Sequence, residues 1–559
     1  MNPLKRAILL TLFSLTAWTV QGIEYPQGLD YDSLRGIPIQ DNGRYKPLDT
    51  YAGESLRDIT GRWNFEGHDP LGYLLSFMTS EEWYKEKIVR IDYQPLKEAL
   101  GLDPAQTHFS YNELAANEQF HKLLDRVSEK HSRNEENFSR LENEVSKLYH
   151  QLSLFQSIQS GEALSVVPPQ GNDEEAAWLS INHPHGYSAE TQDALKKTFL
   201  QVLAAVKNQD AASLTQAGSE LKTQLAQLNP ALYPSPTLIQ REISYNQTRP
   251  FLNSWIYYML AFLLLLVSFY FTNPYLYWIS VATGIVGFGY HSYGLIIRSL
   301  VSGRPPVSNM YESVVFVGWG IILFAIVFEL IYRQRWFIIT ASALGVGMLI
   351  MADLLPFDPD IDPLVPVLRS NYWLIIHVLT ITLSYSAFAL AMGLAHINLG
   401  VYFYFPNRRD LLNNLSLFLY RVLQVGVVLL AAGTILGGVW AAESWGRFWG
   451  WDPKETWALI SLLGYMAILH ARFTDWVANF GTAVCSILGF WLILMTWYGV
   501  NFVLGTGLHS YGFGSGGGWY VIGYLALEVL FLAAVSWKYM AAQALVREVA
   551  AARPAVEPR

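Results

Sequence analysis

The stretch Trp445-Gly446-Arg447-Phe448-Trp449-Gly450-Trp451-Asp452-Pro453-Lys454-Glu455-Thr456-Trp457 joins two strongly apolar segments of the chain. It brings four tryptophans and four charged residues together in one short loop. At a membrane interface, such aromatic side chains can hold a large flat apolar ligand while the charges address its polar edge. A porphyrin with two propionates has this chemistry. The alternative interpretation is an aromatic belt that anchors helix ends.

Apolar segments dominate the second half of the chain. Hydrophobic residues make up 52% of the 559 positions, and only four of the 19 tryptophans precede Pro250. Crossing about 30 Å of hydrocarbon takes roughly 20 apolar residues. Runs of that length lie near 251–271, 275–297, 311–332, 336–355, 372–404, 418–441, 455–472, 479–500 and 519–541. The sequence therefore predicts an all-α polytopic membrane protein with about nine transmembrane helices.

The first half of the chain is different in character. Two early positive charges precede a short apolar run, which is typical of a cleaved signal peptide, with a retained N-terminal anchor as the alternative. A mostly helical extracytoplasmic soluble domain follows, with helical regions at Leu114–Gln159 and Glu190–Leu228. The expected domains are the signal segment 1–22, the soluble domain 23–250, the transmembrane domain 251–541 with its tryptophan-rich loop at 442–457, and a cytoplasmic tail 542–559.

Loop charges predict the orientation, because lysine and arginine favour the cytoplasmic side. They gather in alternate loops and in the tail, at Arg333, Arg335, Arg408, Arg409, Arg472, Lys538, Arg547, Arg553 and Arg559. Arg298 and Arg304 are exceptions on a short outer loop. The tryptophan-rich loop is then expected on the periplasmic side of a bacterial inner membrane, with the C-terminus in the cytoplasm. The net charge of −8 does not indicate a nucleic-acid partner.

The order of residues in 445–460 closely resembles the tryptophan-rich WWD signature of proteins that handle haem during cytochrome c maturation. The continuation PKETW is similar to the CcsA/ResC branch, the membrane synthase subunit of the System II pathway. Three further segments resemble the family in the same order. They are RPPVSNMYES at Arg304–Ser313, LRSNYWLIIHV at Leu368–Val378 and GVNFVLGTGLHSYG at Gly499–Gly512.

The resemblance implies a function. Haem b would cross the membrane as cargo and be attached through thioethers to an apocytochrome c bearing CxxCH, with a ResB-like membrane subunit as partner. The enzymatic role implied is a cytochrome c synthase (haem lyase) subunit. A haem exporter without synthase activity and a bis-histidine haem electron carrier are the alternatives. The single cysteine, Cys485, lies in an apolar run, so thiol-reducing proteins would have to act separately on the acceptor.

Histidines of the membrane half are the candidate iron ligands. His377, near an outer helix end, and His509, in an outer loop, match the family's paired external histidines, and neutral imidazoles can ligate haem iron from both faces. His470 matches the family's membrane-embedded histidine at a transient inner haem site, whose second ligand the partner would supply. His291 and His396 match no family ligand, so packing is expected, with His396 as a substitute candidate.

The remaining candidate contacts lie in the tryptophan-rich loop. Its expected porphyrin-facing residues are Trp445, Trp449 and Trp451. Lys454 or Arg447 can pair with a propionate. Asp452 precedes Pro453, an order typical of a helix cap and first helical position, so Asp452 is expected to shape the cofactor-binding site. No catalytic residue is assigned.

Overall fold

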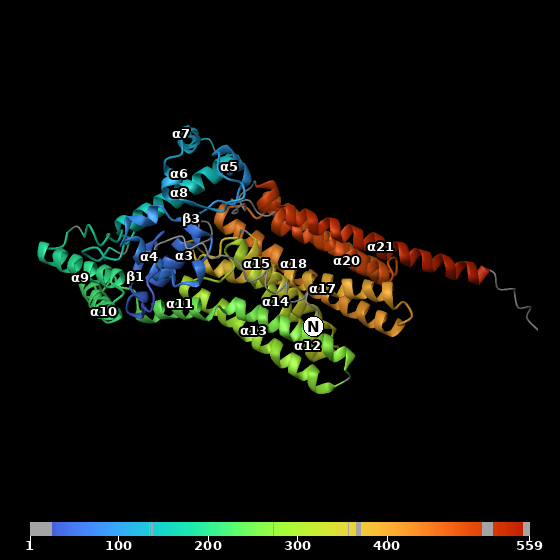
Figure 1. The fold of residues 1–559 in the computed structure, drawn as a ribbon. Coiled ribbons are helices and arrows are strands. Elements are labelled where there is room, and N and C mark those ends of the chain that lie inside the picture. Colours follow the sequence, from blue (N-terminus) through green and yellow to red (C-terminus); the bar gives the residue numbers. More distant parts are fainter. Residues whose placement is uncertain are drawn as a thin grey trace, which may run out of the picture. The chain divides into compact units, whose positions relative to one another are not determined.

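The computed structural model describes residues 25–551, apart from 134, 136, 137, 174, 185, 272, 356, 365–369 and 506–517. The chain forms two compact units that divide between Ile243 and Ser244. Helices make up most of both units (Figure 1), which confirms the predicted helical architecture. The expected signal segment and His509 lie outside the described residues.

The first unit packs helices of up to 21 residues and two antiparallel hairpins around an apolar core. The hairpins pair β1 (Pro38–Asp41) with β2 (Arg44–Pro47), and β3 (Lys87–Arg90) with β4 (His108–Ser110). The helices are α2 (Asp32–Arg35), α3 (Leu48–Thr60), η1 (Phe65–Gly67), α4 (Pro70–Phe77), η2 (Glu81–Tyr84), α5 (Gln94–Ala99), α6 (Tyr111–Ala115), α7 (Glu118–Ser132), α8 (Arg140–Ser160), α9 (Ala189–Lys207) and α10 (Ala211–Leu228). Both predicted helical regions are confirmed, the first by α7 and α8 and the second by α9 and α10.

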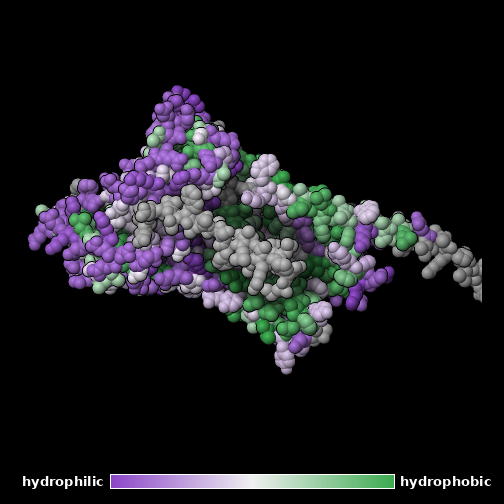
Figure 2. Space-filling model, viewed as in Figure 1, coloured by the Kyte–Doolittle hydropathy of each residue, from purple (hydrophilic) through white to green (hydrophobic). Residues whose placement is uncertain are grey.

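The second unit is a bundle of long helices. After α11 (Pro236–Thr248), which passes from one unit to the other, the elements are α12 (Pro250–Tyr270), α13 (Pro274–Ser302), α14 (Met310–Tyr332), α15 (Trp336–Leu354), α16 (Asn371–Trp373), η4 (Leu374–Val378), α17 (Leu379–Tyr404), α18 (Arg409–Trp445), α19 (Pro453–Phe473), α20 (Asn479–Leu494), η5 (Met495–Leu504) and α21 (Gly518–Ala551). Figure 2 shows mainly hydrophobic surface over these helices and mainly hydrophilic surface over the first unit.

Among the described residues, eight helices are long and apolar enough to cross a membrane, so this is a multi-pass membrane protein. They lie in Pro236–Tyr270, Met310–Tyr332, Trp336–Leu354, Leu374–Tyr404, Arg409–Trp445, Pro453–Phe473, Asn479–Leu504 and Gly518–Leu545. The expected run near 275–297 is α13, a helix of 29 residues. It is not among these eight helices.

Helix α17 is the centre of the bundle. It packs against α14, α15, α18 and α20, and most of its side chains are buried. By contrast, α19 and α21 expose most of their surface. Apolar packing of this kind, with small residues at close approaches, is how helices associate in lipid. The site described below lies among α14, α17, α18, α19 and the two π-helical segments η4 and η5.

A buried ionic cluster fixes the start of α14. Glu312, 1% exposed, accepts hydrogen bonds from Arg298 Nη2 at 2.9 Å and Arg304 Nη1 at 3.2 Å. The same two arginines donate to backbone carbonyls of residues 359, 360 and 362. Glu312 also accepts from the backbone and hydroxyl of Ser308, at 2.8 and 2.7 Å. The cluster therefore ties the 359–362 segment to the loop that enters α14.

Candidate functional site

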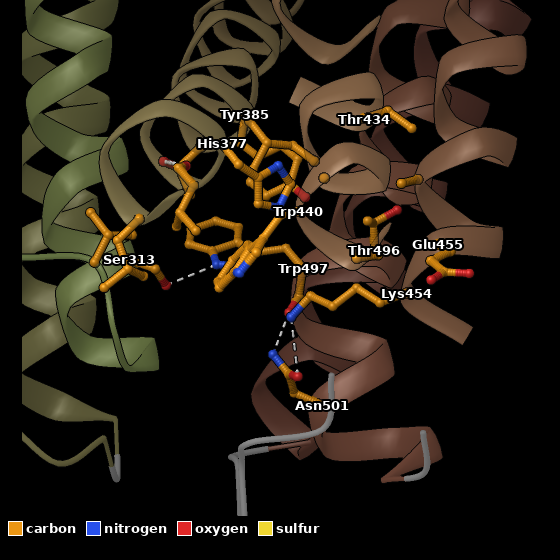
Figure 3. A pocket seen from close by; sticks show the side chains of 18 of the residues that line it. Ser313, His377, Tyr385, Thr434, Trp440, Lys454, Glu455, Thr496, Trp497 and Asn501 are labelled. Atoms are coloured by element: carbon orange, nitrogen blue, oxygen red, sulfur yellow. Dashed lines mark hydrogen bonds between the residues drawn. The ribbon is translucent and has the colours of Figure 1, made fainter. Parts of the chain in front are cut away.

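A cavity opens beside the tryptophan-rich loop, entirely within the second unit (Figure 3). It holds about 1370 Å³ of space not filled by atoms, a figure that includes its open mouth. The walls come from the loop before α14, from η4 and α17, from α18, from the start of α19 and from η5. Of the residues expected at the site, His377, Trp445, Trp449 and Lys454 line this cavity.

His377 sits on η4, a π-helical turn that leads directly into α17. Its Nδ1 atom lies 2.8 Å from the carbonyl oxygen of Gly433 on α18. A carbonyl can only accept, so in the neutral ring Nδ1 carries the proton and Nε2 carries the lone pair. Metal-binding histidines commonly have this arrangement, in which the second ring nitrogen donates to a carbonyl. The backbone of α18 thus sets the tautomer of His377.

Glycines on α18 make room for the aromatic groups around the cavity. A Cβ atom on Gly437 would lie 2.6 Å from Cε1 of His377, and one on Gly438 would lie 2.6 Å from the Phe448 ring. Trp440 meets His377 edge to face, with ring centroids 5.7 Å apart. Only glycine allows these rings to approach the helix so closely. The glycines of α18 therefore lie where the rings of His377 and Phe448 approach the helix.

A second contact braces the turn that carries His377. The indole nitrogen of Trp373, a buried residue just before η4, donates to Oε2 of Glu443 at 2.7 Å. Glu443 lies near the end of α18. Together with the Gly433 contact, this bond attaches η4 to α18 at two levels.

The tryptophan-rich loop is ordered by the first turn of α19. Asp452 caps the helix by accepting from the Lys454 backbone at 2.9 Å, and Pro453 takes the first helical position, as the sequence predicted. Glu455 completes a capping box, with Oε2 accepting from the backbone of Asp452 at 3.2 Å and of Gly450 at 2.7 Å. One carboxylate therefore fixes both the helix start and the loop before it.

The aromatic lining differs in part from the expectation. Trp451 has a positive φ of 57° and is 69% exposed, and it lies outside the described lining while meeting Trp449 edge to face at 5.9 Å. Two other tryptophans, Trp440 and Trp497, line the cavity instead. Neither was expected from the sequence, although each lies in an apolar segment next to one of the segments that resemble the family. The aromatic surface thus comes from three parts of the chain.

A chain of hydrogen bonds crosses one wall. Lys454 Nζ donates to Asn501 Oδ1 at 3.3 Å, and the Asn501 amide donates to the Trp497 carbonyl at 3.0 Å (Figure 3). The Trp497 indole in turn donates to Ser313 Oγ on α14 at 2.9 Å. Asn501 was also missed, although a polar residue in the apolar run before Gly505 is a detectable signal. These bonds connect the start of α19, η5 and α14.

His470 lies far from the cavity, near the other end of α19. Sixteen residues of helix separate it from Lys454, which corresponds to about 24 Å. Its side chain is exposed, and Nδ1 lies 2.7 Å from the Met466 carbonyl oxygen. The structure therefore brings His377 and Lys454 together and leaves His470 apart. The position of His509 is not among the described residues.

The other two membrane histidines have partners of their own. His291 is fully buried and lies 3.2 Å from the Tyr258 hydroxyl and 3.0 Å from the Val315 carbonyl oxygen. His396 lies 2.9 Å from Glu528 Oε2 on α21, with its other ring nitrogen 2.8 Å from the Met392 carbonyl oxygen. These contacts agree with the packing roles expected for both.

The cavity has the properties that a haem needs. Tryptophans supply flat apolar surface, the neutral His377 ring has a lone pair on Nε2 that could ligate iron, and Lys454 supplies a cation in the lining. Gly437 leaves room for the imidazole, and Gly438 leaves room for the Phe448 ring. The residues therefore fit a tetrapyrrole that carries iron and carboxylates.

Comparison with known proteins relates the chain to proteins of cytochrome c assembly. Residues 307–509 match the family described as Cytochrome C assembly protein. The chain is 31% identical to protein NrfI of Wolinella succinogenes over 491 residues, 84% of this chain and 53% of that protein. It is 39% identical to the cytochrome c biogenesis protein CcsA of Guillardia theta over 245 residues, 38% of this chain and 79% of that protein. A CcsA of Prochlorococcus marinus subsp. pastoris is 38% identical over 249 residues, 39% of this chain and 78% of that protein. The chain thus spans about half the length of NrfI.

Proposed function

This chain belongs to the CcsA family of cytochrome c biogenesis proteins, and from that premise we propose that it carries haem across the membrane and presents it in the cavity beside the tryptophan-rich loop. There it supports covalent attachment to an apocytochrome c. The observation that carries the proposal is a histidine, His377, that lines an aromatic cavity and has its Nδ1 atom held by the carbonyl oxygen of Gly433. His509 is proposed as the second axial ligand.

The residues of this chain act by binding and positioning. His377 holds the iron, the tryptophans exclude water from the ring, and the open mouth admits the acceptor. In the attachment step, each cysteine S–H of the CxxCH motif adds across a haem vinyl group. A C–S bond forms, the hydrogen moves to the neighbouring carbon, and no electrons are gained or lost. That chemistry belongs to the haem and the thiols.

The exposed imidazole of His470 supports a partner subunit. An ionisable side chain on a membrane-spanning helix is costly when it faces lipid, and most of α19 is exposed. We assign this face to a ResB-like membrane subunit that would complete the inner haem site with a ligand of its own.

The buried arginines support the proposed orientation. Arg298 and Arg304 were the exceptions to the positive-inside pattern, and both are ion-paired with Glu312 inside the protein. They therefore do not count as exposed loop charge. For a bacterial inner membrane, the proposed location, the remaining charges favour an orientation with the tryptophan-rich loop and the first unit in the periplasm and the C-terminus in the cytoplasm.

Absorption spectra of the purified protein test the proposal, with and without the partner subunit. Wild type should carry haem with a bis-histidine spectrum, His377→Ala and His509→Ala should each change that spectrum, and His470→Ala should lower loading. His396→Gln is the matched control, because the glutamine can still hydrogen-bond Glu528. Wild type without haem under all conditions, or spectra unaffected by these substitutions, would show the proposal to be wrong.

A second assay separates the alternatives. Reduced CxxCH acceptor is added to the haem-loaded protein with its partner, and covalent product is detected by haem staining after denaturation. Product supports the synthase role. Release of haem without covalent product identifies an exporter, and haem that stays bound, cycles its redox state and loads without His470 identifies an electron carrier.

A further inference from the structure

The charged side chains around the cavity differ in whether they already contact charged or polar groups of the protein. The described lining contains one carboxylate, Glu455, and one lysine, Lys454. Glu455 contacts the loop, because Oε2 accepts from two backbone N–H groups and Oε1 lies 3.6 Å from Arg447 Nη1. Oε2 is therefore satisfied by the loop backbone, whereas Oε1 faces Arg447 without a hydrogen bond among the described residues.

Arg447 also contacts groups within the loop. Its guanidinium lies over the Trp445 ring, 5.8 Å from the centroid, and pairs with Glu455. It also packs directly on the loop backbone, since a Cβ on Gly450 would overlap the guanidinium. Its buried Nη1 makes no hydrogen bond among the described residues, but Arg447 is not part of the described lining of the cavity, whereas Lys454 is.

Lys454 is the lysine in the described lining of the cavity. Its one hydrogen bond among the described residues is the 3.3 Å contact to the neutral Asn501 amide, and it forms no ion pair with a carboxylate there. The undescribed segments 365–369 and 506–517 contain no Asp or Glu. Asp452 attracts the ammonium electrostatically but forms no ion pair with it within 4.0 Å among the described residues, and an ammonium has three donors, so donors remain for a ligand. The arrangement favours an anionic group on the ligand.

We infer that Lys454 binds a free propionate carboxylate of the tetrapyrrole, that Asn501 holds the ammonium in place, and that Lys454 rather than Arg447 makes the cavity select carboxylate-bearing tetrapyrroles. The inference rests on the proposed function, because it concerns the same cavity. Lys454 is chosen over Arg447 because Lys454 lines the described cavity, whereas Arg447 packs against the loop. Lys454 acts as a specificity determinant, since the carboxylate lies at the ring edge and takes no part in the thioether chemistry.

The test compares two probes on the full-length protein in detergent. Ferrous iron protoporphyrin IX and its dimethyl ester, in which both propionates are blocked, are titrated and followed by absorption. Wild type should bind the free acid about 10- to 100-fold more tightly, the range of one charge-assisted hydrogen bond. Lys454→Gln should bind the two probes equally, and Lys454→Arg should restore part of the preference.

Arg447→Gln is the matched control and should keep the preference for the free acid, whatever its overall affinity. The inference is overturned if Lys454→Gln keeps the wild-type preference, or if wild type binds both probes equally with a spectrum that depends on His377. If wild type binds neither probe through His377, the proposed function itself fails. The inference is also contradicted if Lys454→Gln binds neither probe while Lys454→Arg binds only the ester.

Discussion

The Nδ1 atom of His377 lies 2.8 Å from the carbonyl oxygen of Gly433, so the candidate iron ligand on one helix is oriented by the backbone of another. The two residues are 56 positions apart in sequence. One turn further along α18, Gly437 leaves the space that the imidazole ring fills. Orientation and space are thus provided by the same helix, and each can be changed separately.

Gly437→Ala should displace the imidazole. The new Cβ would lie 2.6 Å from Cε1 of His377, a distance that requires the ring or the helix to move. We expect haem loading to fall about tenfold, equivalent to 1.4 kcal/mol of binding. Haem per protein, measured from the absorption spectrum, checks this. Gly400→Ala on α17 is the control, because nothing lies within 4 Å of its Cβ and loading should not change. Equal loading in both variants would contradict the account.

The long helices of the second unit could be predicted because each apolar run is long enough to cross a membrane. The cap at Asp452 was likewise predictable, since capping depends on neighbours in sequence. The first hairpin carried a usable signal that was missed. Asn42 and Gly43 form its two-residue turn with φ of 50° and 73°, and an Asn-Gly pair favours such turns.

The geometry of the cavity could not be predicted in the same way. The π-helical turn under His377 depends on contacts with Gly433 and Glu443, which lie far away in sequence. Trp440 and Trp497 reach the cavity only because α18 and η5, which are far apart in sequence, both line it. Long-range packing, which no local pattern encodes, decides which tryptophans face the ligand.

Glu312→Gln should strongly destabilise the second unit. It leaves Arg298 and Arg304 buried without their shared carboxylate, and breaking one partner of a buried ion pair costs about 3–5 kcal/mol. A marked fall in the midpoint of thermal unfolding in detergent is expected. Asp475→Asn is the control, because its pair with Arg472 is a 4.0 Å surface contact worth about 0–1 kcal/mol. If the two variants unfold at the same temperature, the cluster does not stabilise the fold as inferred.

Acid should weaken the start of α8 in the first unit. The hydrogen bond from Lys130, followed by the backbone N–H of Ser139, lowers the pKa of Glu142 from 4.5 to about 2. Because the pKa is lower in the folded state, the stabilisation is fully present above about pH 4.5 and is lost as pH falls toward 2. Hydrogen exchange of the first turn of α8 should therefore quicken, relative to unstructured peptide, over that window.

Glu142→Gln is the comparison for this pH effect. It removes the charge, so exchange protection in that turn should be lower at pH 7 and almost independent of pH between 4.5 and 2. The expected difference at pH 7 is about 0.2–1 kcal/mol, because the pair with Lys130 is partly exposed. Parallel pH profiles in the two proteins would exclude Glu142 as the titrating group.

Asp452 can be tested as a helix cap independently of its charge. Its Oδ1 accepts from the backbone of Lys454, so losing the cap should loosen the turn that positions the Lys454 ammonium. Asp452→Ala should cost about 1 kcal/mol of local stability and lower haem affinity. Asp452→Asn keeps a capping oxygen without the charge and should retain near-wild-type affinity in the same titration. If instead asparagine is as defective as alanine, the carboxylate of Asp452 must act on the ligand or the acceptor directly, since both variants lack the charge and only one lacks the cap.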